Sequence, residues 1–572
     1  GQQKSVQQFF EEKYGMKLQH PDLPCLCFGA QGKNAVPMEL CEFGGGEPAG
    51  IDSQVDRDAV IKHTSGQARE RLQKVEGFAR EVKAEASASG STASAFGIAV
   101  GEPMVVMGRE LQMMGLEYKG GVARPKQHDG SWFADAGGRK FNFARASQVD
   151  RVFVVLCTEG QDAGRFLPWQ ALQTWQTTIK KEADTRGVRF PQFPEQPIVH
   201  TGGKIETTLN RELGPMSLTE RDLVCCILPD KKDRREHDIY ESIKRWMHAT
   251  GVPTQCTQAP KAQRVGKGYD SNMLHKMNLK MGGANWRADR GGLGLLRDAT
   301  GIGSPGTIVF GCDVHHPKPG SDRPSFAALV ASMDMFDYAE HLTLVQKQPT
   351  RMEVVIRLQA MVETCLRRWS DKTGVTPRRI IFYRDGVAHS QFKMVHDHEV
   401  AAIERACEAF SGQPNQIQIV FIVVQKRNHA RFFNTRQQKD WNPTPGTVID
   451  DPGVVSSVMF DFYLVSHWAL KGTARPTHYH VLRNDANLDA DQVQKFTFEL
   501  CHMYGRSTKI VSQPAPTYYA DLAAEQAPFL MKDFQESGGS WEVSSATGTH
   551  ASGASAEFVE VSTSLQNRLF FA

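Results

Sequence analysis

After residue 150, short β-rich runs alternate with amphipathic helical stretches along the chain. A helical stripe of apolar residues is predicted over 352–373 and again over 396–410. Strands that alternate with amphipathic helices form sheets covered on both faces, so this order predicts α/β domains. The predicted strands, each bounded by polar, Gly or Pro residues, are 152–156, 223–228, 307–310, 379–383 and 417–424.

Length and composition limit the class of protein. The chain has 572 residues, enough for about two to four domains. Its 67 basic and 64 acidic residues give a net charge of +3. This balance excludes a protein that binds nucleic acid through its overall charge, so any such binding would have to use local pockets. The 11 cysteines are few and odd in number, which is typical of a reducing compartment. No apolar run is long enough to span a membrane, so we expect a cytoplasmic fragment of a longer protein without membrane contact.

Three segments of biased composition interrupt the alternation. Residues 84–95 are almost all Ala, Ser, Gly and Thr, which predicts a flexible surface loop. The glycine-rich run 290–306 predicts a connection between two domains. Residues 537–556, rich in Ser, Gly, Thr and Ala, predict a disordered insertion.

Two predicted strands each end in an aspartate. Asp313 follows the apolar run that begins at Thr307, and Asp385 follows a similar run and precedes Gly386. Ligands bind at the carboxyl edge of open α/β sheets, and two carboxylates there can hold divalent cations for phosphoryl transfer. Aspartate also caps turns and helices after strands, although no helix to cap is evident here. The residues alone leave both interpretations open.

Basic residues recur at helical spacing between these strands. Tyr240 and Lys244 are four residues apart, as are Lys276 and Lys280, so each pair shares one helix face. With the amide of Gln255, these groups can converge on a phosphate. The alternative is a pair of ordinary solvated helix faces.

The strand-end aspartates belong to a longer series of motifs, which in this order resembles the C-terminal part of a eukaryotic Argonaute. The resemblance runs from about residue 5 to the end of the chain. Segments near 5–10, 21–25 and 38–41 resemble the end of a PAZ domain, and the basic pairs match the pocket of a MID domain. The motifs that resemble a PIWI domain are Gly311-Cys-Asp313-Val-His-His-Pro317, Pro324-Ser-Phe-Ala-Ala328, Phe382-Tyr-Arg-Asp385-Gly386, Val423-Val-Gln-Lys-Arg427, Arg475-Pro-Thr-His-Tyr-His480 and Pro514-Ala-Pro-Thr-Tyr-Tyr519.

The resemblance implies a Rossmann-like MID domain followed by a ribonuclease H-like PIWI domain, both preceded by an L2 linker. The implied boundaries are 1–43 for a PAZ remnant, 44–147 for L2, 148–290 for MID and 291–572 for PIWI. The implied function is a slicer, which binds the 5′-phosphate of a small guide RNA and cuts complementary target RNA with Mg²⁺ or Mn²⁺. Silencing-complex proteins are possible further partners. The main alternative is a guide-loaded scaffold that does not cut, and a third is an unguided nuclease.

The resemblance also implies a catalytic set of four residues: Asp313, Glu353, Asp385 and Asp521. Glu353 lies forty residues after Asp313 and matches a mobile glutamate of the family. Animal and plant members commonly have histidine where this chain has Asp521, whereas other members have aspartate. Since a carboxylate suits Mg²⁺ at least as well as imidazole does, we expect Asp313, Asp385 and Asp521 to be metal ligands.

Guide contacts follow from the same comparison. The residues implied at the guide 5′-phosphate are Tyr240, Lys244, Gln255, Lys276 and Lys280. Those implied along the guide backbone are Lys426, Arg427, Lys471, Arg475, Arg506, Ser512 and Tyr518. Gln526 replaces an arginine that other members send into the pocket. The basic residues of the loop over 231–235 would either supply the positive charge that is missing at Gln526 or would simply be solvated.

Two further expectations concern histidines and origin. His478 and His480 suggest a metal pair, but histidines flanking a tyrosine in a β-rich run are more often core residues. The departures at Asp521 and Gln526, together with the low-complexity segments, point to a filamentous-fungal RNA-silencing (quelling) member of the family.

Overall fold

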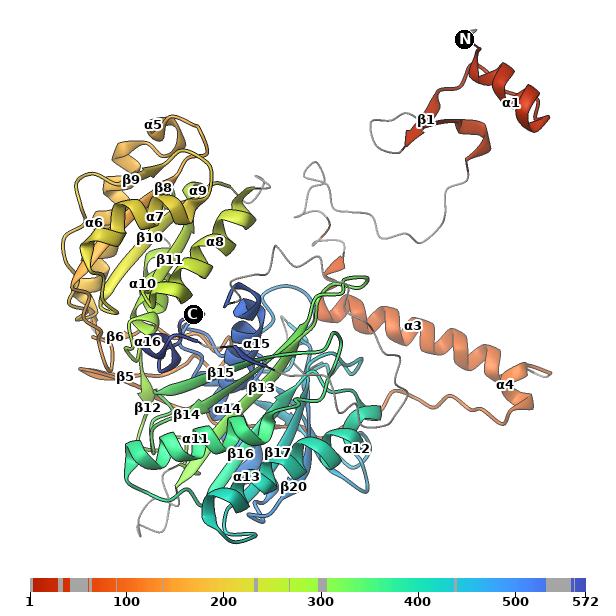
Figure 1. Cartoon of the computed structure of the whole chain (residues 1–572). Coiled ribbons are helices and arrows are strands. Elements are labelled where there is room, and N and C mark those ends of the chain that lie inside the picture. Colours follow the sequence, from red (N-terminus) through yellow and green to blue (C-terminus); the bar gives the residue numbers. More distant parts are fainter. Residues whose placement is uncertain are drawn as a thin grey trace. The chain divides into compact units, whose positions relative to one another are not determined.

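The computed structural model divides into two units, residues 1–64 and 65–572 (Figure 1). In the first unit, helix α1 (Val6–Tyr14) precedes an antiparallel pair, β1 (Cys25–Phe28) and β2 (Asn34–Pro37). Ser5 caps α1 by accepting a hydrogen bond from the backbone N–H of Gln8. The structure describes residues 4–28, 34–41, 60, 64–88, 90–136, 138–230, 235–266, 268–296, 306–436, 440–530, 557–559 and 561–572.

The second unit contains a four-stranded parallel sheet in the order β11-β10-β8-β9. Its central strand β10 is buried along its whole length, which explains why the apolar run around Cys225 and Cys226 has no polar face. The elements of this sheet and its helices are β8 (Arg151–Cys157), α6 (Trp169–Thr185), β9 (Ile198–His200), α7 (Ile205–Leu213), β10 (Asp222–Leu228), α8 (Arg235–Thr250), β11 (Thr254–Gln258) and α10 (Tyr269–Lys280).

The second unit also contains a ten-stranded mixed sheet, in the order β21-β15-β14-β13-β16-β17-β20-β19-β18-β3 (Figure 1), and two small antiparallel sheets of three and two strands. Parallel strands β13, β16 and β17 lie at its centre. Apolar side chains of α11 and α13 fill one face of these strands, whereas those of α14 and α15 fill the other. The elements are β3 (Arg109–Glu110), β13 (Thr307–His315), β14 (Ser325–Ser332), β15 (His341–Gln348), α11 (Leu358–Thr373), β16 (Arg379–Asp385), α13 (Ala401–Ser411), β17 (Gln418–Gln425), β18 (Thr447–Ile449), β19 (Phe460–Val465), β20 (Thr477–Asn484), α14 (Ala490–His502), α15 (Ala515–Gln526) and β21 (Glu557–Val559).

All five predicted strands are present, as β8, β10, β13, β16 and β17, and the mixed α/β class is confirmed. The prediction of a loop over 84–95 was wrong in part. Helix α3 (Ala68–Ser87) extends into this segment and a short helix α4 (Thr92–Ala95) follows, because alanine is the strongest helix former and Ser91 caps α4. Residues 297–305 of the glycine-rich run and the predicted insertion 537–556 lie outside the described residues.

Both predicted helices differ from the structure at their starts. α11 begins at Leu358 rather than near 352, because Arg351 has a positive φ of 58° and the backbone N–H of Val355 bonds to the Glu399 carboxylate. Glu353 therefore precedes the helix and does not lie in its first turn. The second helix begins earlier than predicted, with α12 (Phe392–Val395), and continues through a π-helical turn, His396–Val400, into α13. Such turns are frequent at functional sites, and this one carries Glu399.

Glycine at position 311 allows α15 to pack directly on the sheet. A Cβ on Gly311 would lie 2.1 Å from the backbone carbonyl carbon of Pro516 in the first turn of α15. Only glycine permits this approach without a shift of the helix. α15, which carries Asp521, is therefore held against the strand that carries Asp313.

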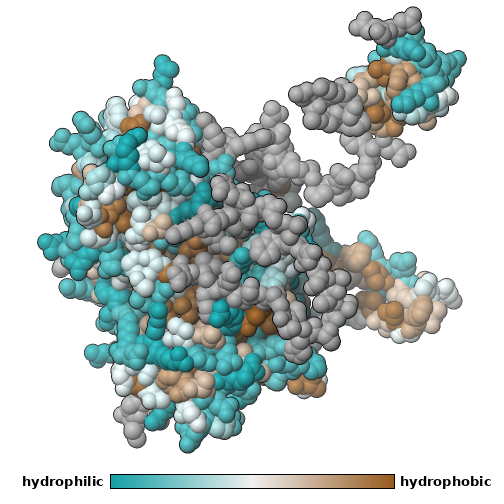
Figure 2. Space-filling model, viewed as in Figure 1, coloured by the Kyte–Doolittle hydropathy of each residue, from teal (hydrophilic) through white to brown (hydrophobic). Residues whose placement is uncertain are grey.

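On the face shown in Figure 2, the visible surface of the second unit is mainly polar, with scattered apolar side chains. Val75 and Phe78 of α3 and Phe96 beside α4 are among the exposed large hydrophobic residues. Within the described ranges, no helix combines the length and apolar character that crossing a membrane requires.

Candidate active site and phosphate pocket

Asp313 and Asp385 lie at the carboxyl ends of adjacent parallel strands, as the sequence predicted. β13 pairs with β16 so that Cys312 lies opposite Arg384, which places the two aspartates at one edge of the sheet. Asp521 reaches the same edge from α15, where it is exposed, and its charge acts on both other carboxylates. Three carboxylates from three elements therefore converge.

Burial and the neighbouring carboxylates raise the cost of ionising Asp313 and Asp385. Burial, followed by the charges of Asp385 and Asp521, raises the pKa of Asp313 to about 8. Burial also raises the pKa of Asp385, although hydrogen bonds from Gln513 and Gly386 oppose this. A divalent cation would remove this repulsion, and carboxylate oxygens are the ligands that Mg²⁺ and Mn²⁺ prefer. The donor set thus fits such an ion, with Asp313, Asp385 and Asp521 as its ligands.

Glu353 lies beside these aspartates in the segment before α11. A Cβ on Gly386 would lie 3.4 Å from Asp313 Oδ1 and 3.6 Å from Glu353 Oε1, so both carboxylates face the same point. His316 Nε2 lies 2.8 Å from Glu353 Oε2, and Arg384 donates to Oε1 at 3.0 Å. Burial raises the pKa of Glu353, but these two partners outweigh it and the pKa is lowered. Glu353 is therefore held as an anion at the site.

Arg384 supports the site from inside the sheet. Its side chain is fully buried and donates to the equally buried Glu399 at 2.9 Å, as well as to the carbonyl oxygen of Glu353 at 2.7 Å. One guanidinium thus joins strand β16, the segment that carries Glu353 and the π-helical turn. No sequence pattern indicated a role for Arg384, Glu399 or His316. Arg384 and His316 lie inside the quoted motifs, which was the available signal.

The raised pKa of Asp313 predicts a pH dependence of stability in metal-free protein. Between about pH 4 and pH 8 the folded form keeps the Asp313 proton that the unfolded chain loses, so the free energy of unfolding falls as pH rises. The contribution is up to about 1.4 kcal/mol per pH unit. Urea unfolding in EDTA should show this slope in the unaltered protein relative to Asp313→Asn. Parallel stability curves for the two proteins would contradict it.

The two basic pairs meet around the start of β11. Lys244 Nζ donates to Thr254 Oγ1 at 3.0 Å, and Lys280 Nζ donates to Gln255 Oε1 at 2.9 Å. Lys244 also lies 5.4 Å from the ring centre of Tyr240. Burial and the nearby cations, Arg506 first among them, lower the pKa of Lys276 to about 8. The structure therefore brings all five predicted residues into one cluster of basic and polar side chains, the candidate phosphate pocket.

Arg506 and Gln526 both have interactions that the sequence did not predict. Arg506 acts electrostatically on Lys276 and Lys280, so it faces the pocket in addition to any contact with the guide backbone. The side chain of Gln526 is buried and donates to the carbonyl oxygen of Phe571 at 3.3 Å. The hypothesis that 231–235 supplies the missing cation concerns side chains outside the described residues.

Of the other residues predicted to contact the guide backbone, three form one hydrogen-bonded group and three are exposed. Lys426 Nζ donates to Tyr518 Oη at 3.1 Å, and that hydroxyl lies 2.7 Å from Ser512 Oγ. The exposed residues are Arg427, Lys471 and Arg475.

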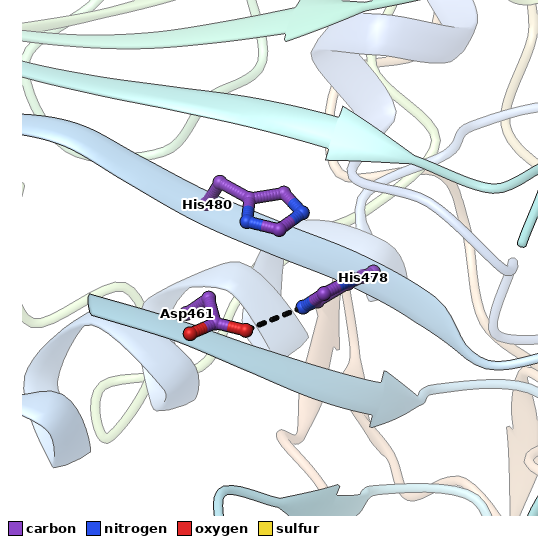
Figure 3. A group of neighbouring side chains, drawn as sticks. All are labelled: Asp461, His478 and His480. Carbon is purple, nitrogen blue, oxygen red and sulfur yellow. Dashed lines mark hydrogen bonds and ion pairs between the residues drawn. The ribbon is translucent and has the colours of Figure 1, made fainter. Parts of the chain in front are cut away.

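Asp461, His478 and His480 form a separate cluster on β19 and β20 (Figure 3). Their ligand atoms all lie within 4.8 Å of one another. However, His478 Nε2 is only 2.6 Å from Asp461 Oδ2, which is too short for two ligands of one ion, and Asp461 Oδ1 already accepts the backbone N–H of Ser456. The cluster is a hydrogen-bonded Asp–His pair in which the His478 ring stacks on Tyr463, in agreement with the expectation of core histidines.

Comparisons with known proteins agree with this architecture. The Piwi domain family matches residues 223–532 and the PAZ domain family matches residues 1–64. The chain is 32% identical over 574 residues to protein argonaute PNH1 of Oryza sativa subsp. japonica, which covers 92% of this chain and 55% of that protein. It is 33% identical over 582 residues to protein argonaute 1D of the same organism, covering 94% and 53%. The chain thus spans about half the length of the curated relatives it matches.

Solved structures share the fold. The crystal structure of Kluyveromyces polysporus Argonaute with a guide RNA matches with a TM-score of 0.76 at 22% identity, covering 100% of this chain and 65% of that one. Drosophila Piwi matches with a TM-score of 0.69 at 20% identity, covering 100% and 69%. Because the Piwi match spans more than half of the chain and its curated relatives are Argonautes, the chain belongs to the eukaryotic Argonaute family.

Proposed function

We propose that the chain is a small-RNA-guided RNA endonuclease, with a MID domain at 148–290 that binds the guide 5′-phosphate and a PIWI domain at 291–572 that cuts paired target RNA. The observation that carries this proposal is the convergence of Asp313, Asp385 and Asp521, with Glu353 beside them. Three carboxylates whose charges oppose one another serve no structural purpose that apolar residues would not serve better. L2 would span 44–147, after a PAZ remnant at 1–43.

In this proposal the protein's own residues hold and orient the reacting groups. Asp313, Asp385 and Asp521 bind the ions, and Glu353 completes the anionic set because His316 and Arg384 keep it ionised. Bound Mg²⁺ or Mn²⁺ would supply Lewis-acid polarisation of the scissile phosphate. Asp521 is exposed, so the site is open to solvent on the side where an RNA strand would bind.

The phosphate pocket would fix one end of the guide, and Lys426, Tyr518 and Ser512 would position its backbone. Such contacts place a strand without reading it, so base pairing with the guide selects the target. We further propose a cytoplasmic location, silencing-complex proteins as partners and a filamentous-fungal (quelling) origin. The residue choices at Asp521 and Gln526 support this last point.

The test is a cleavage reaction with purified protein loaded with a 5′-phosphorylated guide. A perfectly paired, end-labelled RNA target should be cut in Mg²⁺ and not in EDTA, and a target without complementarity should stay intact. Guide and target binding without any cut would favour the non-slicing scaffold. Cutting that does not require the guide would favour an unguided nuclease. Either result overturns the proposal.

The pocket gives a prediction about guide affinity. Lys276→Met should lower the preference for a 5′-phosphorylated over a 5′-hydroxyl guide by about tenfold or more, because a charged hydrogen bond contributes about 1.5–3 kcal/mol. The ratio of the two dissociation constants, measured by filter binding, isolates the phosphate contribution. As a control, Lys471→Met should weaken both guides alike and leave the ratio unchanged. An unchanged ratio in Lys276→Met would show that Lys276 does not bind the guide 5′-phosphate.

A further inference from the structure

Gln513 contacts the carboxylate of Asp385, one of the proposed catalytic residues. Gln513 itself is not among the residues that the sequence predicted for the site. It lies immediately before Pro514 and α15, with 5% of its surface exposed. Its Nε2 donates to Asp385 Oδ2 at 2.5 Å, while the backbone N–H of Gly386 donates to Oδ1 at 2.8 Å. Each carboxylate oxygen thus accepts one hydrogen bond and keeps a lone pair for another partner.

The segment that carries Gln513 is itself fixed in place. Thr477 Oγ1 donates to the carbonyl oxygen of Ser512 at 2.6 Å, and Ser512 Oγ lies 2.7 Å from Tyr518 Oη on α15. Pro514 restricts the backbone of Gln513 to extended conformations. The amide therefore has a defined position and can set the orientation of Asp385, rather than follow it.

We propose that Gln513 is a positioning residue for cleavage, which fixes the rotamer of Asp385 so that both carboxylate oxygens present a free lone pair to the divalent ion. This inference rests on the proposed function, because it concerns the same site. Partners that orient a metal ligand from outside are typically worth about 10- to 100-fold in metal affinity or activity. Burying an amide costs free energy unless its polar atoms form hydrogen bonds. A purely space-filling role would therefore favour an apolar side chain at this position.

Two substitutions separate orientation from packing. Gln513→Met keeps the length of the side chain and removes the donor, whereas Gln513→Asn keeps the amide but is one methylene too short to reach Asp385. Gln494 provides a matched control, because it is also fully buried and its Nε2 donates to an aspartate, Asp450 Oδ2, at 3.0 Å. Gln494→Met breaks the same kind of bond away from the site.

The first measurement is Mn²⁺ binding to protein without RNA, followed by the electron paramagnetic resonance signal of free Mn²⁺. Gln513→Met should weaken binding by about 10- to 100-fold, Gln513→Asn should weaken it in the same direction, and Gln494→Met should leave it unchanged. Equal Mn²⁺ binding by Gln513→Met and the unaltered protein would overturn the inference. This measurement stands even if the protein does not cut RNA.

The second measurement is the single-turnover cleavage rate as a function of Mg²⁺ concentration. Gln513→Met should need about tenfold or more Mg²⁺ for half-maximal rate and should recover much of its rate at saturating Mg²⁺. A loss of rate that Mg²⁺ does not restore, or the same loss in Gln494→Met, would indicate a structural role and contradict the inference. Absence of cleavage by the unaltered protein would instead count against the proposed function.

Discussion

Asp385→Asn should abolish guided cleavage, with a loss on the order of a thousandfold or more, while guide binding remains intact. The substitution replaces a carboxylate by an amide of the same shape at the meeting point of three acidic side chains. Asn lacks the charge that holds a divalent cation, and its oxygen is a weaker ligand. Single-turnover cleavage of a perfectly paired target, measured with guide in excess, gives the rate directly.

Asp385→Asn should not unfold the protein, so a loss of cleavage can be attributed to the site itself. Asp385 raises the pKa of Asp313 through its charge, so removing that charge relieves repulsion in the metal-free site. The melting temperature of Asp385→Asn in EDTA should therefore equal or exceed that of the unaltered protein. Asp397→Asn, which removes an exposed carboxylate paired with Lys393, provides the control and should cut normally. Cleavage by Asp385→Asn within tenfold of the unaltered rate would exclude Asp385 as a metal ligand.

Arg384→Met should have the largest effect on stability, a loss of about 3–5 kcal/mol in the free energy of unfolding. Arg384 and Glu399 are both fully buried, and the guanidinium forms ion pairs with both Glu399 and Glu353. Without it, Glu399 remains as an uncompensated charge in the interior. Urea unfolding followed by tryptophan fluorescence measures the change.

A double substitution tests whether the loss comes from this pair. Arg384→Met together with Glu399→Gln removes both charges, so the double variant should be more stable than the sum of the two single losses predicts. The coupling should exceed about 1 kcal/mol, since the two side chains share several hydrogen bonds. Strict additivity, or a loss below about 1 kcal/mol in Arg384→Met, would mean that water or another group compensates Glu399.

The strands and the position of two aspartates could be predicted because their signals are local. An apolar run that ends in Asp313 or Asp385 specifies both a buried strand and a carboxylate at its end, whatever else the chain does. The four-residue spacing of Lys276 and Lys280 likewise needs only one helix. The parallel pairing of β13 and β16 then follows from the helix α11 between β15 and β16 and from the sheet order.

The supporting residues could not be predicted because their signals are not local. Gln513 contacts a carboxylate 128 positions away, and no spacing rule connects the two. The start of α11 was misplaced because Val355 bonds to Glu399 on a distant turn, which overrides local helix propensity. The role of Gly311 depends on a helix that follows about two hundred residues later.

The position of the cut along the target shows whether a guide directs cleavage. A set of targets should carry the same complementary segment at different positions along otherwise constant RNA, each incubated in Mg²⁺ with protein loaded with one guide. If a guide directs cleavage, each target should be cut once, and the cut should move along the RNA by the same number of nucleotides as the paired segment. A cut that stays at one position in the constant RNA, or no cut at all by the unaltered full chain, would contradict guide-directed cleavage.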